Sequence, residues 1–172
     1  MTPRSRLALA CVAAVLGGAA SVAATPAWCL GFGSLGPVRT GMTVEQVLRL
    51  ADWPGLERRK PAGDCWYMKY RAAGADFDLM ILGGRVARIE LTGESRLRTF
   101  SGARLGSAES DLRTLYGRGL ESQPHKYDPD GRTLTFKSPD GTLGLRFETS
   151  HGKVTAIQSG PWEHLNLVEG CG

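Results

Sequence analysis

The chain has 172 residues, of which 42% are hydrophobic and 22% are charged, and its formal net charge is +4. This composition is typical of an ordinary globular domain. It excludes a disordered chain, a collagen-like repeat and a bundle of membrane-spanning helices. Beyond the N-terminus no Lys/Arg-rich run occurs, so the sequence does not predict a nucleic-acid-binding patch. Composition alone names no function.

Residues 1–24 have the order of a secretory signal peptide. A short basic start precedes apolar residues 7–20, and Val22-Ala23-Ala24 supplies the small residues that a signal peptidase reads. The apolar run is shorter than the roughly 20 residues of a transmembrane helix. We therefore expect an exported protein, periplasmic or extracellular, with no transmembrane segment in the mature chain.

Cysteine usage predicts one disulfide. Cleavage removes Cys11 and leaves Cys29, Cys65 and Cys171, an odd number in an oxidising compartment. Cys65 begins a predicted strand and Cys171 closes a tail without periodicity, so we expect a Cys65–Cys171 bond that anchors the tail. Cys29 lies beside the Gly-rich residues 31–36, which we interpret as a flexible start of the mature chain. We expect Cys29 to be the unpaired thiol.

Two short helices are predicted, one in each half of the mature chain. The first begins after Thr43, an N-cap candidate with Gln46 three residues later, and ends before Pro54. The second begins after Ser107 and ends at Gly117, a residue type favoured where a helix stops. Isolated helices of this length are marginal in water, so both need packing against the rest of the domain.

Each predicted helix is followed by segments with the period-two alternation of strands. Apolar side chains such as Phe77 and Phe147 fall on one side and polar side chains on the other, which is typical of an antiparallel sheet with one covered face. In the third strand of each half the apolar residues are three apart, which indicates a bulge or an edge position. The strands are predicted around residues 65–71, 75–82, 86–89, 133–137, 145–148 and 154–157.

The two halves are also similar in sequence. Residues 41–47 align with residues 106–112 at an offset of 65, and residues 84–89 align with residues 152–157 at an offset of 68. Because both alignments occur in the same order along the chain, they indicate an internal repeat.

We therefore predict one α+β domain over residues 25–172. Repeat one covers about residues 36–92, repeat two about residues 101–159, and residues 160–172 form a tail. The two αβββ repeats are expected to form one antiparallel sheet of about six strands, with the two short helices on one face.

A short motif in the first helix resembles a known signature. Gly41-Met42-Thr43, Gln46-Val47 and Ala51-Asp52 before Pro54 are similar to the helix signature of the tandem-repeat family related to β-lactamase inhibitory protein. The same signature occurs in BamE/SmpA-type outer-membrane assembly proteins. Those families usually have Leu-Gly where Ala51-Asp52 stands. The resemblance implies a non-catalytic protein-binding module, either an envelope component or an inhibitor of a secreted enzyme. It further implies no enzyme activity, no cofactor and a protein partner in the cell envelope or outside the cell.

The polar side of the predicted sheet is the candidate partner-binding face. Tyr, Met and Arg are enriched in recognition surfaces, and the alternation directs residues of these types away from the core. We expect the face to be exposed and to include Tyr67, Lys69, Asp78, Met80, Thr135, Lys137, Arg146 and Glu148.

An alternative function uses loop residues. His125, Tyr127 and His164 are the candidates for a small-ligand-binding protein or a hydrolase. No histidine stands at metal-ligand spacing from another histidine or a cysteine, and no serine lies in a nucleophile-elbow motif. The sequence therefore assigns neither a catalytic residue nor a metal site.

Cleavage near Ala24 is directly testable. Intact-mass analysis of the protein isolated from its native compartment should show loss of about the first two dozen residues. A retained Met1, or a lipid adduct on Cys29, would contradict the expected export and processing.

Overall fold

The computed structural model describes residues 28–50, 55–57, 63–72 and 74–171. The predicted signal peptide lies outside these residues. The α+β class is confirmed: most of the described elements are strands, and the three α-helices are short. Helix α1 spans Val44–Arg49, α2 spans Glu109–Tyr116 and α3 spans Trp162–Leu165.

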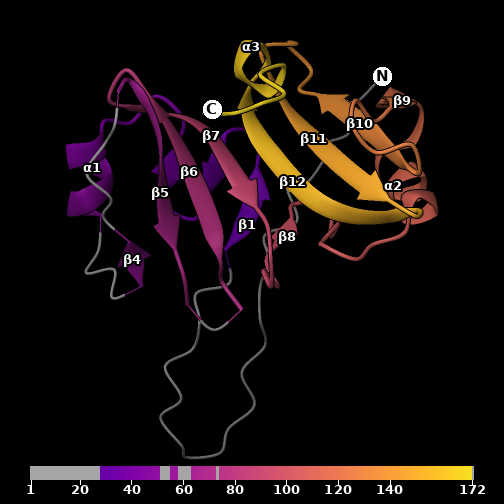
Figure 1. Cartoon of the computed structure of the whole chain (residues 1–172), viewed down its shortest axis with the longest axis horizontal. Helices are drawn as coiled ribbons and strands as arrows, with labels where there is room; N and C mark the ends of the chain where they lie inside the picture. The colour runs from indigo at the N-terminus through magenta and orange to yellow at the C-terminus, as the bar shows by residue number, and fades with distance from the viewer. Residues whose placement is uncertain (1–27, 51–54, 58–62, 73, 172) are drawn as a thin grey trace, which may run out of the picture.

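The main sheet has eight strands in the order β4–β5–β6–β7–β12–β11–β10–β9 (Figure 1). All neighbouring strands are antiparallel. In chain order these strands are β4 Leu56–Glu57, β5 Cys65–Tyr70, β6 Phe77–Leu82, β7 Arg85–Leu91, β9 Leu120–Pro124, β10 Gly131–Lys137, β11 Leu143–Ser150 and β12 Lys153–Pro161.

The prediction of one six-stranded sheet is wrong, because β4 and β9 add an outer strand at each edge. Neither has an apolar alternation that the sequence reveals. β4 has two residues, and in β9 only Leu120 is buried. An edge strand pairs on one side only and needs no apolar pattern, so the periodicity did not predict these strands.

A second, four-stranded sheet packs on the main sheet, in the order β3–β2–β1–β8. It consists of β1 Cys29–Gly31, β2 Ser34–Leu35, β3 Val38–Arg39 and β8 Arg98–Thr99. The Gly-rich stretch is therefore not a flexible start of the mature chain. Leu30, Leu35 and Val38 have no exposed surface, and Gly33 provides the positive φ of 64° in the tight turn between β1 and β2.

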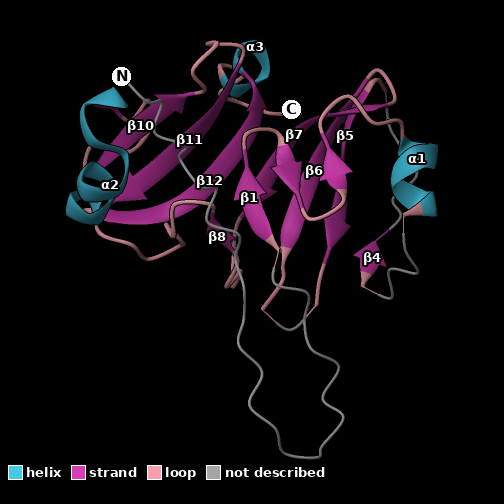
Figure 2. Cartoon of the chain, turned by 180° about the vertical axis from the view of Figure 1, so that it is seen from behind, coloured by secondary structure: helices cyan, strands magenta, loops and turns pink. Residues whose placement is uncertain are grey.

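One face of the main sheet carries the apolar core. Figure 2 shows β1 over the middle of this face, with α1 and α2 towards its two ends. The alternation predicted this face correctly: Phe77, Leu79, Ile81, Leu145 and Phe147 are fully buried. Burying one such side chain stabilises the fold by about 1.5–3 kcal/mol. The short helices contribute side chains to this apolar core: Val47 from α1, and Leu112 and Tyr116 from α2.

The predicted N-cap residue is confirmed for α1 and is wrong for α2. Thr43 caps α1 as predicted: its Oγ1 accepts a hydrogen bond from the Gln46 amide, and the Gln46 side chain accepts one from the Thr43 amide. The N-cap of α2 is Ala108 rather than Ser107. Asp111 accepts from the Ala108 amide, while the Ser107 hydroxyl accepts from the Arg104 amide instead.

The junction between helix and third strand is built in the same way in both halves. The Gly41 amide donates to the Val86 carbonyl at 2.7 Å, and the Gly106 amide donates to the Val154 carbonyl at 2.8 Å. The amides of Val86 and Val154 donate to the carbonyls of Met42 and Ser107 at 2.8 and 2.9 Å. These residues correspond at the two sequence offsets.

Both third strands also have the bulge that their spacing indicated. The β6–β7 register shifts between Met80 and Ile81, and the β11–β12 register shifts between Glu148 and Thr149. The alternative of an edge position is wrong, because β7 and β12 are central strands and pair with each other.

The core assignment predicts a clear difference between two substitutions. Phe147→Ala removes a fully buried ring that lies 5.2 Å from the Tyr116 ring, and it should cost about 3–5 kcal/mol of unfolding free energy. Leu115→Ala on the exposed side of α2 is the control and should change it by less than about 0.5 kcal/mol. Urea unfolding measures both. Similar losses for the two variants would contradict the assigned faces.

Candidate functional site: the polar face of the main sheet

The face opposite the core carries a row of polar residues that runs across six strands. The strand registers place Lys69 beside Asp78, Asp78 beside Glu90, Glu90 beside Gln158, Gln158 beside Arg146, and Arg146 beside Thr135. A second row places Tyr67 beside Met80 and Met80 beside Arg88. We call this side of the sheet the polar face. All eight predicted site residues lie on it.

The expected exposure of the polar face is wrong at its centre. Met80 has 0% of its surface exposed, Asp78 has 8% and Arg146 has 5%. Of the other predicted residues, Lys137 is exposed, whereas Tyr67, Lys69, Thr135 and Glu148 are half-buried. Alternation along a strand gives the direction of a side chain but not what lies over it. Here residues 162–171, which we call the C-terminal segment, contact the same face.

A glycine makes room for helix α3 on the polar face. Gly144 of β11 and Gly160 of β12 are direct neighbours in the sheet. A Cβ at Gly144 would lie 3.0 Å from Leu165 Cδ1 and 3.1 Å from Trp162 Cε3. Leu165 is buried at this place, and the Lys137 ammonium lies 4.2 Å from the centre of the Trp162 ring. The absence of a side chain at Gly144 therefore lets the helix lie close to the strands, whereas a Cβ at Gly160 would lie 2.8 Å from the Ala87 carbonyl oxygen of β7.

Arg88 is the most deeply buried charge on the polar face, with 1% of its surface exposed. Its Nε and Nη2 lie 2.8 and 2.7 Å from Glu90 Oε1. Its Nη1 donates to the backbone carbonyls of Leu167 at 2.8 Å and His164 at 3.2 Å. A buried guanidinium needs such partners, because removal from water is costly. The C-terminal segment thus satisfies a charge in the first half of the chain.

Tyr67 completes this group from β5. Its hydroxyl donates to Glu90 Oε1 at 3.1 Å and accepts from Arg88 Nη2 at 3.2 Å. Burial raises the pKa of the Tyr67 phenol above its ordinary value, and the Glu90 carboxylate raises it further. The phenol is therefore a neutral donor at physiological pH.

Sequence reasoning missed Arg88, Glu90 and Gln158, although a signal was present. A bulge takes one residue out of the alternation. Because Val86 and Ile89 both face the core across the bulge, Arg88 and Glu90 fall on the polar face.

Arg146 holds the second connection to the C-terminal segment. Its Nη1 donates to the Leu165 carbonyl at 2.8 Å, and its Nη2 lies 3.1 Å from Glu148 Oε1. Burial lowers the pKa of the guanidinium. Arg146 Nε and the neighbouring Gln158 Oε1 are buried without a hydrogen-bond partner among the described residues. The centre of the polar face therefore retains one donor and one acceptor that nothing within the described chain satisfies.

The loop between β9 and β10 borders this centre. His125 Nδ1 accepts from the amides of Tyr127 at 3.2 Å and Asp128 at 3.0 Å, so the ring proton of the neutral form lies on Nε2. That nitrogen is 3.8 Å from Glu148 Oε2. The loop geometry thus orients His125 towards the carboxylate that also pairs with Arg146.

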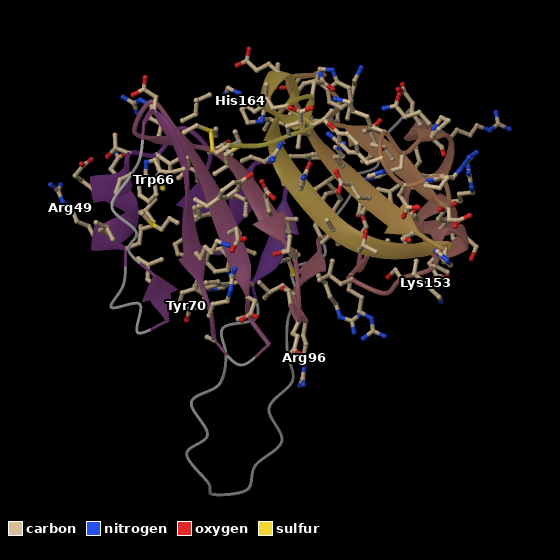
Figure 3. The ribbon with its side chains drawn as sticks, viewed as in Figure 1. Arg49, Trp66, Tyr70, Arg96, Lys153 and His164 are labelled. Atoms are coloured by element: carbon tan, nitrogen blue, oxygen red, sulfur yellow. A yellow bond between two sulfur atoms is a disulfide. The ribbon has the colours of Figure 1, made fainter. Side chains whose placement is uncertain are left out.

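The far end of the C-terminal segment is held at two places. Glu169 Oε1 accepts from the Tyr127 hydroxyl at 2.6 Å and lies 3.0 Å from the Lys126 ammonium. These two contacts lower the pKa of the Glu169 carboxyl. The predicted Cys65–Cys171 disulfide is confirmed, with the two Cα atoms 5.3 Å apart. Figure 3 shows this sulfur–sulfur bond beside the labelled Trp66. Cys29 is also disulfide-bonded, so the expectation that it is a free thiol is wrong.

The three residues of the alternative function do not converge. His125 and Tyr127 share one loop, whereas His164 lies on α3, and among the described residues no hydrogen bond or ion pair joins His164 to the other two. A groove of about 270 Å³ beside β9 is not lined by any of the three. Its lining residues are Glu121, Ser122, Gln123, Thr135, Trp162 and Asn166.

Comparisons with known proteins add no relative. No protein-family model, no curated protein and no solved structure matches the chain. Within the described ranges, no group of three or more His, Cys, Asp or Glu side chains is arranged to hold a metal ion. None of the helices in those ranges is long and apolar enough to cross a bilayer.

The buried ion pair predicts the effect of removing one partner. Arg88→Met leaves the Glu90 carboxylate buried beside a neutral chain and should cost about 3–5 kcal/mol of unfolding free energy. The double variant Arg88→Met/Glu90→Gln should lose less unfolding free energy than Arg88→Met alone, because no charge is then left unpaired. Arg96→Met, at an exposed arginine, is the matched control. Chemical unfolding at neutral pH gives the three values. Equal stability of Arg88→Met and the control would contradict the role of Arg88.

Proposed function

We propose that this protein is a non-catalytic protein-binding module, an envelope component or an inhibitor of a secreted enzyme, that binds its partner through the polar face. One observation carries the proposal: the face already binds a polypeptide segment, namely the chain's own residues 162–171. The guanidinium groups of Arg88 and Arg146 donate to three backbone carbonyls of that segment. Main-chain carbonyls are common to all proteins, so this chemistry suits a protein ligand.

The chemistry around the C-terminal segment also supports binding. Arg146 Nε and Gln158 Oε1 are buried there without a hydrogen-bond partner among the described residues, so the centre keeps hydrogen-bonding capacity that is not used within the chain. The half-buried Lys69 and Thr135 and the exposed Lys137 surround this centre. A partly desolvated centre with a polar, solvent-accessible rim is the usual anatomy of a protein interface.

Cysteine chemistry supports the proposed location. A disulfide between Cys65 and Cys171 persists only where thiols are not kept reduced. Together with the signal-peptide pattern of residues 1–24, this favours export to the periplasm or the extracellular space.

We further infer that the two halves are copies of one unit. The recurring hydrogen bonds of Gly41 and Gly106, the matched bulges and the order of helix followed by four strands support this inference. It agrees with the resemblance to the tandem-repeat family related to β-lactamase inhibitory protein. Proteins of that family bind other proteins without catalysis, which is the activity proposed here.

Charge reversal on the polar face tests the proposal. Immobilised full-length protein is incubated with native envelope extract and, separately, with culture medium. Lys69→Glu and Lys137→Glu, one in each half, should each reduce capture of the partner that the wild type binds at least tenfold, about 1.4 kcal/mol, and a thermal melt should show that both variants are folded at the temperature of the capture. Lys153→Glu is the matched control, because Lys153 is exposed at the first position of β12, away from His164 and α3 (Figure 3).

Mapping separates this interface from other binding surfaces. A photo-reactive side chain at Thr135 should cross-link to the captured protein, and one at Arg49 on α1 should not. Capture that is unchanged in both lysine variants, or cross-linking only from Arg49, would overturn the proposed face.

A further inference from the structure

The C-terminal segment has two parts that are held differently. Residues 162–167 are built into the fold: Leu165 is buried, and the carbonyls of residues 164, 165 and 167 accept from buried arginines. Residues 168–171 have no such anchor among the described contacts. They are held by the Cys65–Cys171 bond, by the Gly170 amide, which donates to the Leu167 carbonyl at 3.3 Å, and by the exposed Glu169 contacts with Lys126 and Tyr127. Exposed ion pairs hold a segment weakly.

The second part lies directly over the Tyr67–Arg88 group. Gly170 has a φ of 61°, and a Cβ at this position would overlap the Tyr67 hydroxyl and lie 3.4 Å from Arg88 Nη2. Only a residue without a side chain fits there. Residues 168–171 therefore cover the Tyr67 hydroxyl and the Arg88 guanidinium, which hydrogen-bond to each other and to Glu90 beneath this cover.

We propose that residues 168–171 are a removable cover, and that reduction of the Cys65–Cys171 bond opens the Tyr67–Arg88 surface to a polypeptide segment of a partner. The inference rests on the proposed function. The reductant is a dithiol: it gives two electrons and two protons, becomes a disulfide itself, and leaves Cys65 and Cys171 as thiols. The anchored residues 162–167 remain in place, so the buried guanidinium of Arg88 keeps its carbonyl partners.

The residues of the cover indicate which partner segment could bind in its place. Glu169 presents a carboxylate to Lys126 and Tyr127, and Gly170 places bare backbone over Tyr67. A partner segment that takes this place therefore needs an acidic residue followed directly by glycine. A side chain at the second position would meet the Tyr67 hydroxyl.

Hydrogen exchange of the full-length protein tests the opening. Samples with the Cys65–Cys171 bond intact and reduced are compared by mass spectrometry. The proposal expects exchange to rise at least tenfold at amides of residues 168–171, while β5, β6 and β7 keep their protection. Unchanged exchange in residues 168–171 would overturn it. Equal loss of protection in the three strands would also overturn it, because the bond would then act as a general staple.

Disulfide trapping tests the specificity. Full-length Cys171→Ser protein has a Cys65 thiol and is mixed with synthetic peptides that cover residues 168–171, each with its cysteine activated as an aromatic mixed disulfide. The Cys65 thiolate attacks the peptide sulfur, and the aromatic thiolate leaves. The native peptide should react at least tenfold faster than a peptide with leucine in place of Gly170, and by a smaller factor faster than one with lysine in place of Glu169.

Two outcomes would contradict the removable cover without contradicting the proposed function. Equal rates for the three peptides would overturn the cover as a recognition site. Partner capture that depends on Lys69 and Lys137 but is the same before and after reduction would also overturn it, while leaving the proposed function intact. Capture that increases on reduction and falls with Tyr67→Phe supports the cover.

Discussion

The burial of two arginines on the polar face constrains the rest of the structure. Arg88 and Arg146 lie on different halves of the chain, and both are almost completely removed from water. A charge in this position needs an opposite charge and further hydrogen-bond acceptors. Glu90 and Glu148 supply the charges from the same strands. The remaining acceptors are backbone carbonyls of the C-terminal segment, so the end of the chain has to return to the middle of the sheet.

Several separate features of the structure hold the C-terminal segment on the middle of the sheet. Gly144 leaves the surface open where α3 lies, and Leu165 packs there. The Cys65–Cys171 bond joins the end of the chain to β5, a strand of the first half. In the sheet, β6 and β7 lie between β5 and β12. The ladder between β7 and β12 has only three residue pairs, so the C-terminal segment adds a second connection between the halves.

Sequence periodicity predicted the parts of the fold that depend on local pattern. The side chains of Phe77 and Phe147, the Thr43 cap and the bulges follow from alternation and spacing within a few residues. The disulfide followed from compartment and from the position of Cys65 and Cys171. The parts that were missed depend on distant contacts. Gly-rich residues 31–36 become strands only because the main sheet offers an apolar face to pack against, and β9 forms only because β10 lies beside it. The candidate site was predicted only in part, for the same reason. The strand pattern placed the eight residues on one face, but no local sequence pattern indicated that residues 162–171 return to cover that face.

The central position of β7 has a consequence for synthesis of the chain from its N-terminus. β7 ends at Leu91, and its partner β12 begins only at Lys153. Until β12 has been made, β7 is an open edge with unpaired backbone groups along an apolar strand. The acceptors for Arg88 arrive later still, among the last ten residues. An incomplete chain therefore combines an open edge with an unsatisfied charge, and a second incomplete chain is the nearest source of a pairing strand. Delayed folding until the whole chain has emerged avoids this edge-to-edge pairing.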